Sequence, residues 1–260
     1  MKISIITVCY NSAATIRNTF ESVLNQTYLD IEYIIVDGKS KDDTVYIIKE
    51  FEPKFNNKMR WISEPDNGIY DAMNKGIKMA TGDIISILNS DDYYASKNIL
   101  TMVNEEMSKE EIDSCYGNLL YIKNNKPYRY WRSGYKKSFK FGWMPPHPSF
   151  FVRRNIYEKY GLFRLDCGIN ADYELMLRYF EVHNISTKWI DKTFVCMNTG
   201  GKSNKNIKSR MDAIIDNKIA WTVNKIKPNI FTLFLKRFRK IPQYFKAMFY
   251  KNEINRSLFS

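Results

Sequence analysis

The residues best suited to chemistry are two adjacent carboxylates, Asp91 and Asp92, which follow directly on an apolar run. Asn89 and Ser90 precede them, so four polar side chains come together where a buried strand is expected to end. Mg²⁺ typically takes one or two protein carboxylates and completes its shell with phosphate oxygens and water. The pattern favours a divalent-cation site. The alternative is a turn in which Asp92 or Ser96 caps the next helix.

A second set of polar residues is suited to binding a nucleotide. Asp37 and Gly38 end another apolar run, where a carboxylate can accept hydrogen bonds from a base or a ribose. A turn aspartate that accepts its own backbone amides fits that position equally well. The stretch 64–76 is also polar and contains several glycines. The sequence holds neither a G-x-G-x-x-G motif nor a P-loop, so the two common phosphate-binding loops are excluded.

Asp172 is a candidate general base. It falls in the first turn of an expected helix, where a carboxylate can simply complement the helix dipole. Leu175 and Met176 indicate partly apolar surroundings, which would raise the pKa of the carboxyl and suit a base. The only histidines, His147 and His183, are far apart in the sequence, so no Ser/His/Asp triad or histidine-rich metal site is predicted. His147 lies on a proline-rich loop and either lines a pocket or is structural.

Alternating strands and helices must position these residues. Short β-branched runs predict buried parallel strands. They span residues 3–8, 32–36, 59–63 and 83–88. Apolar residues at helical spacing predict helices between them, and Thr81-Gly82 marks the end of the third helix. Such an order indicates βαβ units and an α/β fold with a doubly wound, mainly parallel sheet. Ligands of these sheets bind beyond the carboxyl ends of the strands, where the polar clusters fall.

Beyond residue 95 the pattern is less regular. We expect strands over 115–122 and 127–132 and a helix over 171–180. A pair of strands is expected near 187–198, followed by a glycine hinge at 200–201.

The C-terminal part of the chain is strongly basic. The whole chain carries a net charge of +12, and from Lys202 onward fourteen Lys/Arg face three acids. Apolar residues between 231 and 249 recur at three- and four-residue steps, with basic residues on the other side and Pro242 as a kink. We expect 201–260 to be a basic amphipathic helical extension that docks peripherally on the inner face of the cytoplasmic membrane. The alternative is that the stripe packs on the rest of the chain or on a second subunit.

Composition narrows the class of protein further. With 44% hydrophobic and 15% aromatic residues, the chain is not disordered as a whole. No apolar run approaches the ~20 residues of a bilayer span, and no signal peptide is expected. The four scattered cysteines give no disulfide or zinc pattern and fit a cytoplasmic protein. No nucleic-acid-binding motif accompanies the basic segment, so no nucleic acid partner is expected.

Five segments in order resemble the family 2 glycosyltransferases of the GT-A fold. The nearest resemblance is to bacterial enzymes that build capsule, O-antigen or exopolysaccharide. The segments are 5–11, 36–44, 64–77, 80–92 and 171–178. The resemblance spans roughly residues 3–200. It implies a GT-A catalytic domain over 1–200, with a nucleotide-sugar-binding half of about 1–95 and an acceptor half of about 96–200.

The resemblance also implies an activity and a set of site residues. The activity is inverting transfer of a hexosyl or N-acetylhexosaminyl group from a nucleotide donor, usually a UDP-sugar. The acceptor is a hydroxyl of a glycan or of a polyprenyl-pyrophosphate-linked sugar. A Mg²⁺ or Mn²⁺ ion would bind Asp91 and Asp92, and Asp172 would be the catalytic base. Donor contacts fall at Thr7, Val8, Tyr10, Asn11, Asp37, Gly38, Asp66, Asn74, Asn89 and Ser90.

Two positions depart from the family pattern. Asn89 replaces the first aspartate of the D-x-D motif, which removes one negative charge near the diphosphate. Met73 stands where many members have an arginine, so a positive partner for the diphosphate is missing or comes from Lys75 or elsewhere.

Two other functions fit the same residues. A nucleotidyltransferase acting on a sugar phosphate would use similar carboxylates and release pyrophosphate instead of UDP. A non-catalytic sugar-nucleotide-binding protein would bind without turnover. A homodimer is also compatible with the sequence.

Overall fold

The structure is a computed structural model that describes residues 1–109, 111–199, 218–227, 232, 235 and 238–249, with side chains up to residue 247. The expected hinge at 200–201 and the remaining residues of the extension lie outside this part of the chain.

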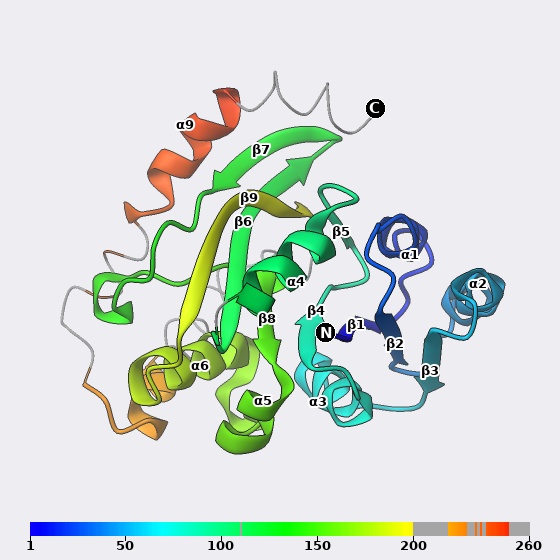
Figure 1. Cartoon of the computed structure of the whole chain (residues 1–260), viewed down its shortest axis with the longest axis horizontal. Coiled ribbons are helices and arrows are strands. Elements are labelled where there is room, and N and C mark those ends of the chain that lie inside the picture. Colours follow the sequence, from blue (N-terminus) through cyan, green and yellow to red (C-terminus); the bar gives the residue numbers. More distant parts are fainter. Residues whose placement is uncertain (110, 200–217, 228–231, 233–234, 236–237, 250–260) are drawn as a thin grey trace.

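Four parallel strands build the first half of the sheet (Figure 1). In the order β3-β2-β1-β4, they are β3 (Met59–Ser63), β2 (Ile31–Asp37), β1 (Ile3–Cys9) and β4 (Ile84–Ile87). The connecting helices are α1 (Ile16–Leu24), α2 (Thr44–Phe51) and α3 (Ile69–Met79). The α/β alternation predicted for this half is confirmed, and so is the end of α3 before Thr81-Gly82.

The second half of the sheet is mixed. Its strands are β5 (Asp92–Tyr94), β6 (Ser114–Lys123), β7 (Lys126–Trp131), β8 (Phe150–Arg153) and β9 (Thr187–Asn198). β8 lies antiparallel between β4 and β6, β9 runs parallel to β6, and β7 pairs with β6. The helices are α4 (Ile99–Lys109), α5 (Arg154–Tyr160) and α6 (Ala171–Leu177), and a π-helix continues α6 over Arg178–Val182.

Two expectations for this half need correction. The pair of strands near 187–198 is one continuous strand, β9, because register shifts in β6 accommodate the exposed Asp191-Lys192 without breaking the strand. The helix at 171–180 changes to a π-helix at Arg178. Short 3-10 helices at 52–55, 139–141, 147–149 and 165–170 complete the backbone.

Two hydrophobic clusters cover the two faces of the sheet. In β1, Ile3 and Ile5 point into the cluster under α1, α2 and α4, while Ile6 and Val8 point into the cluster under α3, α5 and α6. This alternation follows from the two-residue period of a strand. The two layers of helices confirm the doubly wound arrangement, and they leave the carboxyl ends of β1–β4 open at one edge.

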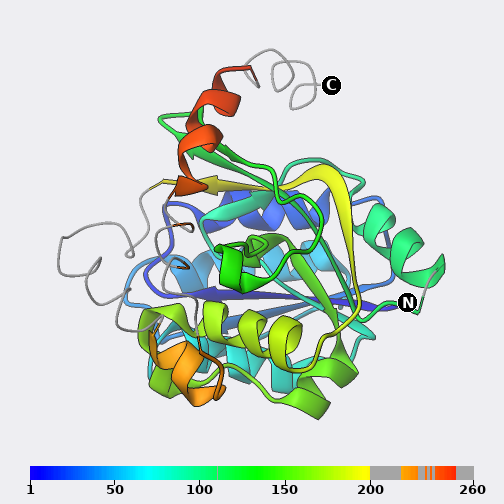
Figure 2. The ribbon, with the colours of Figure 1, turned by 90° about the vertical axis from the view of Figure 1, so that its left-hand side faces the viewer.

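The described parts of the C-terminal segment pack on the rest of the chain. Ala220 and Trp221 are buried against the α6 layer, and the Trp221 indole donates a 3.0 Å hydrogen bond to the Tyr173 hydroxyl. Helix α9 (Ile241–Phe249) lies along β7, away from α6 (Figures 1 and 2). No helix in the described ranges is both long and apolar enough to span a bilayer.

Candidate active site

The buried carboxylate of Asp37 ties two strand ends together. It accepts hydrogen bonds from the Ser63 hydroxyl at 2.6 Å, from the Ser40 amide at 3.0 Å and from the Ser40 hydroxyl. Asp37 is fully buried. These bonds fix the carboxyl end of β2 to that of β3, and so shape the edge where a ligand of the sheet would bind.

Gly38 brings Tyr10 and Asp66 into one place. A Cβ atom on Gly38 would lie 2.5 Å from Asp66 Oδ2 and 3.5 Å from the Tyr10 ring, so only glycine allows this approach. Asp66 also accepts a 2.8 Å hydrogen bond from the Gly68 amide, which fixes its loop just before α3. The Tyr10 side chain is 47% exposed, so its ring offers a face on which a planar group can stack.

Asn11 and Ser12 join the ends of β1, β2 and β4. The Asn11 amide donates to Ser40 Oγ at 2.8 Å, and its side-chain oxygen accepts from the Lys41 amide at 2.8 Å. The Ser12 and Ser90 hydroxyls lie 2.9 Å apart. The structure therefore brings Tyr10, Asn11, Asp37, Gly38, Asp66 and Ser90 together at one edge of the sheet, as the sequence predicts.

Three other residues that were predicted to contact the nucleotide-sugar donor make their contacts within the protein instead. The buried Thr7 hydroxyl lies 2.9 Å from the Tyr33 hydroxyl and donates to the Leu88 carbonyl at 2.8 Å. Val8 is a core side chain. The Asn74 amide binds the Phe163 backbone twice: its nitrogen donates to the carbonyl at 2.9 Å, and its oxygen accepts from the amide at 3.0 Å.

Several oxygens in the segment 89–92 lack partners. The Asn89 amide nitrogen donates to Asp92 Oδ2 at 3.0 Å, but Asn89 Oδ1 and Asp92 Oδ1 are buried without a hydrogen bond. Asp91 is partly exposed, and within the described residues no cation lies within 4.0 Å of its carboxylate. Asn198 on β9 holds the Asp91 carbonyl at 2.9 Å.

Burial also sets the protonation of the two carboxylates. It raises the pKa of Asp91 above its ordinary value. Burial, together with the negative charge of Asp91, raises the pKa of Asp92 well above its usual range. Two carboxylates and an amide oxygen, all lacking cationic partners, are a donor set that a hard divalent cation fits. The described chain has no cluster of three or more His, Cys, Asp or Glu, so phosphate oxygens and water would complete the shell.

Asp172 is held at the start of α6 by a residue that the sequence did not single out. The Tyr70 hydroxyl, on α3, lies 3.2 Å from Asp172 Oδ1 and 2.8 Å from the Ile169 carbonyl. The Tyr173 amide donates to the same Oδ1 at 2.8 Å. Among the described residues, no hydrogen bond reaches Oδ2. Tyr70 lies within the segment 64–77 that carried the resemblance, which is the one signal that could have drawn attention to it.

His147 lies in the same region and is neutral at pH 7. Burial lowers its pKa, and the charge of Asp172 opposes this shift only in part. Its ring packs edge-on against Phe163, with centroids 5.4 Å apart. His147 is therefore a buried residue that packs on the aromatic core and lies near enough to Asp172 to sense its charge.

The other acids near Asp172 are bound to arginines. Glu174 is fully buried and pairs with Arg178, which also donates to the backbone carbonyls of 160–162. Asp166 is exposed and forms a two-bond pair with Arg164. Among the described residues, no arginine pairs with Asp172, in contrast to Glu174 and Asp166.

The sequence departures have structural consequences. Met73 is buried in the core at 2% exposure, so an arginine at this position would need a different environment. Lys75 Nζ already binds Glu64 at 2.7 Å and the Pro65 carbonyl at 2.8 Å. Met73 carries no charge, and the charge of Lys75 is already paired with Glu64, so neither residue supplies a positive charge to a ligand at the strand edge.

A comparison with known proteins places the chain in a family. The profile described as "Glycosyl transferase family 2" matches residues 4–171. The chain belongs to glycosyl transferase family 2. An uncharacterized glycosyltransferase of Mycobacterium tuberculosis is 33% identical over 185 residues, which are 68% of each chain. A PGL/p-HBAD biosynthesis glycosyltransferase of Mycobacterium bovis is 29% identical over 203 residues, which are 77% of this chain and 78% of the relative.

Solved glycosyltransferase structures share the fold. The S. aureus TarS fragment 1-349 in complex with UDP-GlcNAc superposes with a TM-score of 0.66 at 16% identity, covering 96% of this chain and 73% of TarS. A mannosyltransferase from Pyrobaculum calidifontis, in complex with GDP-Man and Mn²⁺, gives a TM-score of 0.63 at 14% identity and covers 96% and 75%. This family 2 chain is a glycosyltransferase with the GT-A fold, as the sequence predicts.

Proposed function

We propose that this family 2 member transfers a sugar from a UDP-sugar to a hydroxyl with inversion at the anomeric carbon. The observation that carries the proposal is the pair of buried, unpartnered oxygens on Asn89 and Asp92, with the Asp91 carboxylate next to them, beside the edge that holds Tyr10 and Asp37. Hydrogen-bond acceptors of this kind, buried next to a strand edge, suit a cation that carries a nucleoside diphosphate.

In the proposed mechanism the chain orients both substrates. Tyr10 stacks on the base and Asp66 receives hydrogen bonds from the nucleoside, while the buried Asp37 holds the ends of β2 and β3 together beside them. Asp91 and Asp92 hold Mg²⁺ or Mn²⁺, which would offset the charge that develops on the leaving diphosphate. Tyr70 and the Tyr173 amide hold Asp172 through Oδ1. The other oxygen then accepts the proton of the acceptor hydroxyl as it attacks, on the face opposite the diphosphate.

The substrate classes are part of the proposal. A hexosyl or N-acetylhexosaminyl donor is supported by solved relatives bound to UDP-GlcNAc and GDP-Man. A glycan or lipid-linked acceptor is supported by the M. bovis relative, whose name refers to PGL/p-HBAD biosynthesis. Peripheral contact with a membrane is supported by exposed apolar residues near the C-terminus. They are Phe238 at 63%, Ile241 at 52% and Phe245 at 64% exposure.

A donor screen tests the proposed function. The full chain is incubated with UDP-, GDP- and dTDP-sugars, Mn²⁺ and sugar-bearing lipid pyrophosphates, and the released nucleotide and the anomeric configuration of the product are determined. We expect UDP release and an inverted product. Release of pyrophosphate would favour a nucleotidyltransferase, and donor binding without turnover would favour a binding protein.

A further inference from the structure

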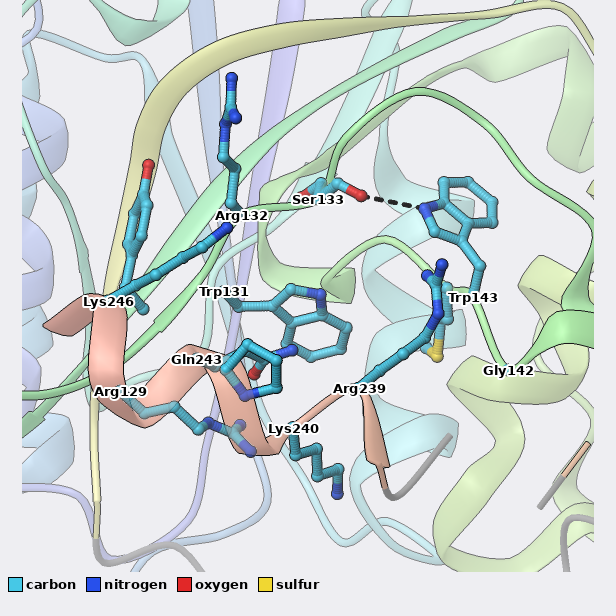
Figure 3. Close-up of a pocket in the computed structure, with 13 residues that line it drawn as sticks. Arg129, Trp131, Arg132, Ser133, Gly142, Trp143, Arg239, Lys240, Gln243 and Lys246 are labelled. Atoms are coloured by element: carbon cyan, nitrogen blue, oxygen red, sulfur yellow. Dashed lines mark hydrogen bonds between the residues drawn. The ribbon is translucent and has the colours of Figure 1, made fainter. Parts of the chain in front are cut away.

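A cavity of about 230 Å³ lies in the acceptor half, outside the site described above (Figure 3). One wall comes from β7 and the turn after it, the second from the loop 142–144, and the third from α9 and the two residues before it. Figure 3 shows side chains of α9 and β7 around the space, and the Trp143 indole bound to the Ser133 carbonyl at 3.0 Å. Water takes up about 30 Å³ per molecule, so a phosphate ester with several waters fits such a volume.

The lining of the cavity is cationic and contains no acid. Five lining residues are Arg or Lys, and none is Asp or Glu. Arg132 is neutralised by a two-bond pair with Asp191. Arg129 is only 8% exposed and lies over the Tyr121 ring at 3.7 Å, with no carboxylate within 4.0 Å among the described residues. Burial lowers the pKa of Arg239, and no described acid opposes this shift.

An unsatisfied polar group also faces this space. Gln243 lines the cavity, and its side-chain oxygen is buried without a hydrogen-bond partner. The two ends of an amide exchange places by a 180° turn, so Gln243 can present N–H donors to an anion or its oxygen to a hydroxyl. A buried arginine without a counter-ion indicates a missing anionic ligand, and the unpartnered Gln243 oxygen indicates a missing polar group in the same cavity, such as a hydroxyl of that ligand.

The helix that lines the cavity carries an apolar face beside it. At about 100° per residue, Ile241 and Phe245 share one side of α9, Lys246 flanks that side, and Gln243 faces away from it. Phe238 lies just before α9 and is also exposed. A third side packs on the chain, where Ala247 is buried and the Tyr244 ring meets Tyr128 at 5.4 Å. The apolar side expected from the sequence is therefore exposed in the structure, and the chain itself does not cover it in the described part.

We infer that this cavity binds the headgroup phosphate of an anionic membrane lipid while the apolar side of α9 enters the adjacent acyl region. The inference deepens the proposed function, on which it rests for the membrane setting of the reaction. Charge complementarity selects the phosphate, and the exposed aromatic face selects a lipid over an acidic peptide, which would leave that face in water. Cations beside an apolar helix face suit the headgroup boundary of an anionic leaflet.

Paired charge deletions test the inference. Arg239→Gln/Lys246→Gln removes two cavity cations. The control, Lys225→Gln/Lys227→Gln, removes two exposed cations near α6, away from α9 (Figure 2). Binding of the full chain to phosphatidylcholine vesicles with and without phosphatidylglycerol is measured. We expect the cavity pair to weaken anionic-vesicle binding about tenfold or more, and the control pair by less than about threefold.

Three results would overturn the inference. Equal losses of vesicle binding in both double variants would mean that the basic segment attracts the membrane diffusely. Unchanged vesicle binding in Arg239→Gln/Lys246→Gln would mean that the cavity plays no part in it. Tight binding of inorganic pyrophosphate without vesicle binding would assign the cavity to a soluble phosphate.

UDP release with a water-soluble acceptor is measured in parallel. If release is intact while vesicle binding is unaffected by the cavity pair, only the cavity proposal fails. If the wild type binds vesicles but never releases UDP, only the proposed function fails.

Discussion

At the residue scale, the environment of each carboxylate decides what it can do. Asp166 and Glu174 are both paired with arginines, whereas Asp172 is held only by a tyrosine hydroxyl and a backbone amide. An arginine partner stabilises the charged form of a carboxylate and makes it a weaker base. The hydrogen bonds of Asp172 orient it through one oxygen.

Asp172→Asn should lower kcat by about 10²–10⁴-fold, because the amide keeps the shape but cannot accept the acceptor's proton. UDP affinity should stay within about twofold, since the proposed contacts with UDP are made by residues other than Asp172. The matched control is Asp166→Asn, six residues earlier, which should leave kcat nearly unchanged. Steady-state kinetics and UDP titration check both variants. A kcat for Asp172→Asn within a few-fold of wild type would show that the base lies elsewhere.

The raised pKa values of Asp91 and Asp92 predict a pH-dependent response to metal. Between the ordinary Asp value of about 3.9 and the raised native values, the folded chain binds more protons than the unfolded chain, so its metal-free stability falls as pH rises. Mn²⁺ competes with those protons. The rise in Tm caused by Mn²⁺ with UDP should therefore grow with pH across this window and disappear in Asp91→Asn. Thermal melts over a pH series check this, and a Mn²⁺ effect that Asp91→Asn leaves intact would contradict the metal role.

At the element scale, the site at the strand ends depends on close approaches of the backbone, such as that of Gly38 to the Asp66 side chain. Gly38→Ala should push the Asp66 carboxylate aside, since the new Cβ would lie 2.5 Å from its oxygen. The clash involves the tip of a side chain, so stability should fall by less than about 1 kcal/mol. UDP affinity should fall about tenfold. A double-mutant cycle with Asp66→Ala isolates the effect, and additive losses would mean that Gly38 acts independently of Asp66.

The elements that could be predicted from the sequence are those with a long apolar pattern. Strands β1–β4 and helices α1–α3 have it, and the edge they form was expected to carry the site. Strand β5 has only three residues, and β8, although as long as β4, follows short 3-10 helices and no helix with a regular apolar spacing. The pair of strands expected near 187–198 is a single strand, because β9 keeps pairing with β6 on both sides of Asp191-Lys192 through shifts in register. Neither the Asn74 bond to Phe163 nor the Tyr70 contact with Asp172 could be predicted, because each partner is about ninety or more residues away.

At the scale of the whole molecule, the boundary at residue 201 does not separate two packing units. Trp221 is 1% exposed in the same cluster as α6, and its indole binds Tyr173. Trp221→Ala should therefore lower the free energy of unfolding by about 3–5 kcal/mol. Trp221→Phe should lower it less, since the ring still fills the space and only the hydrogen bond is lost. Chemical denaturation checks both variants, and a loss below about 1 kcal/mol for Trp221→Ala would contradict this packing.

Truncations give a second test at this scale. A chain ending at Lys227 retains Trp221 and should fold and bind UDP, but it should no longer bind anionic vesicles. A chain ending at residue 199 lacks Trp221 and should be much less stable. Circular dichroism melts and vesicle sedimentation measure the two properties. A folded, stable chain ending at 199 would show that residues 218–227 are dispensable for the catalytic domain.

Helix α3 connects the two halves of the molecule. The Asp66 loop leads directly into it, Tyr70 in its first turn contacts Asp172, and Asn74 one turn later binds the Phe163 backbone. In the proposed mechanism the helix acts as a fixed spacer between the donor and Asp172, because its rise and rotation per residue are set by backbone geometry. A single inserted residue before Tyr70 would turn its side chain by about 100°. The gap available to the transferred sugar is thus set by helical pitch more than by loop flexibility, and a larger sugar would have to be accommodated at the acceptor side.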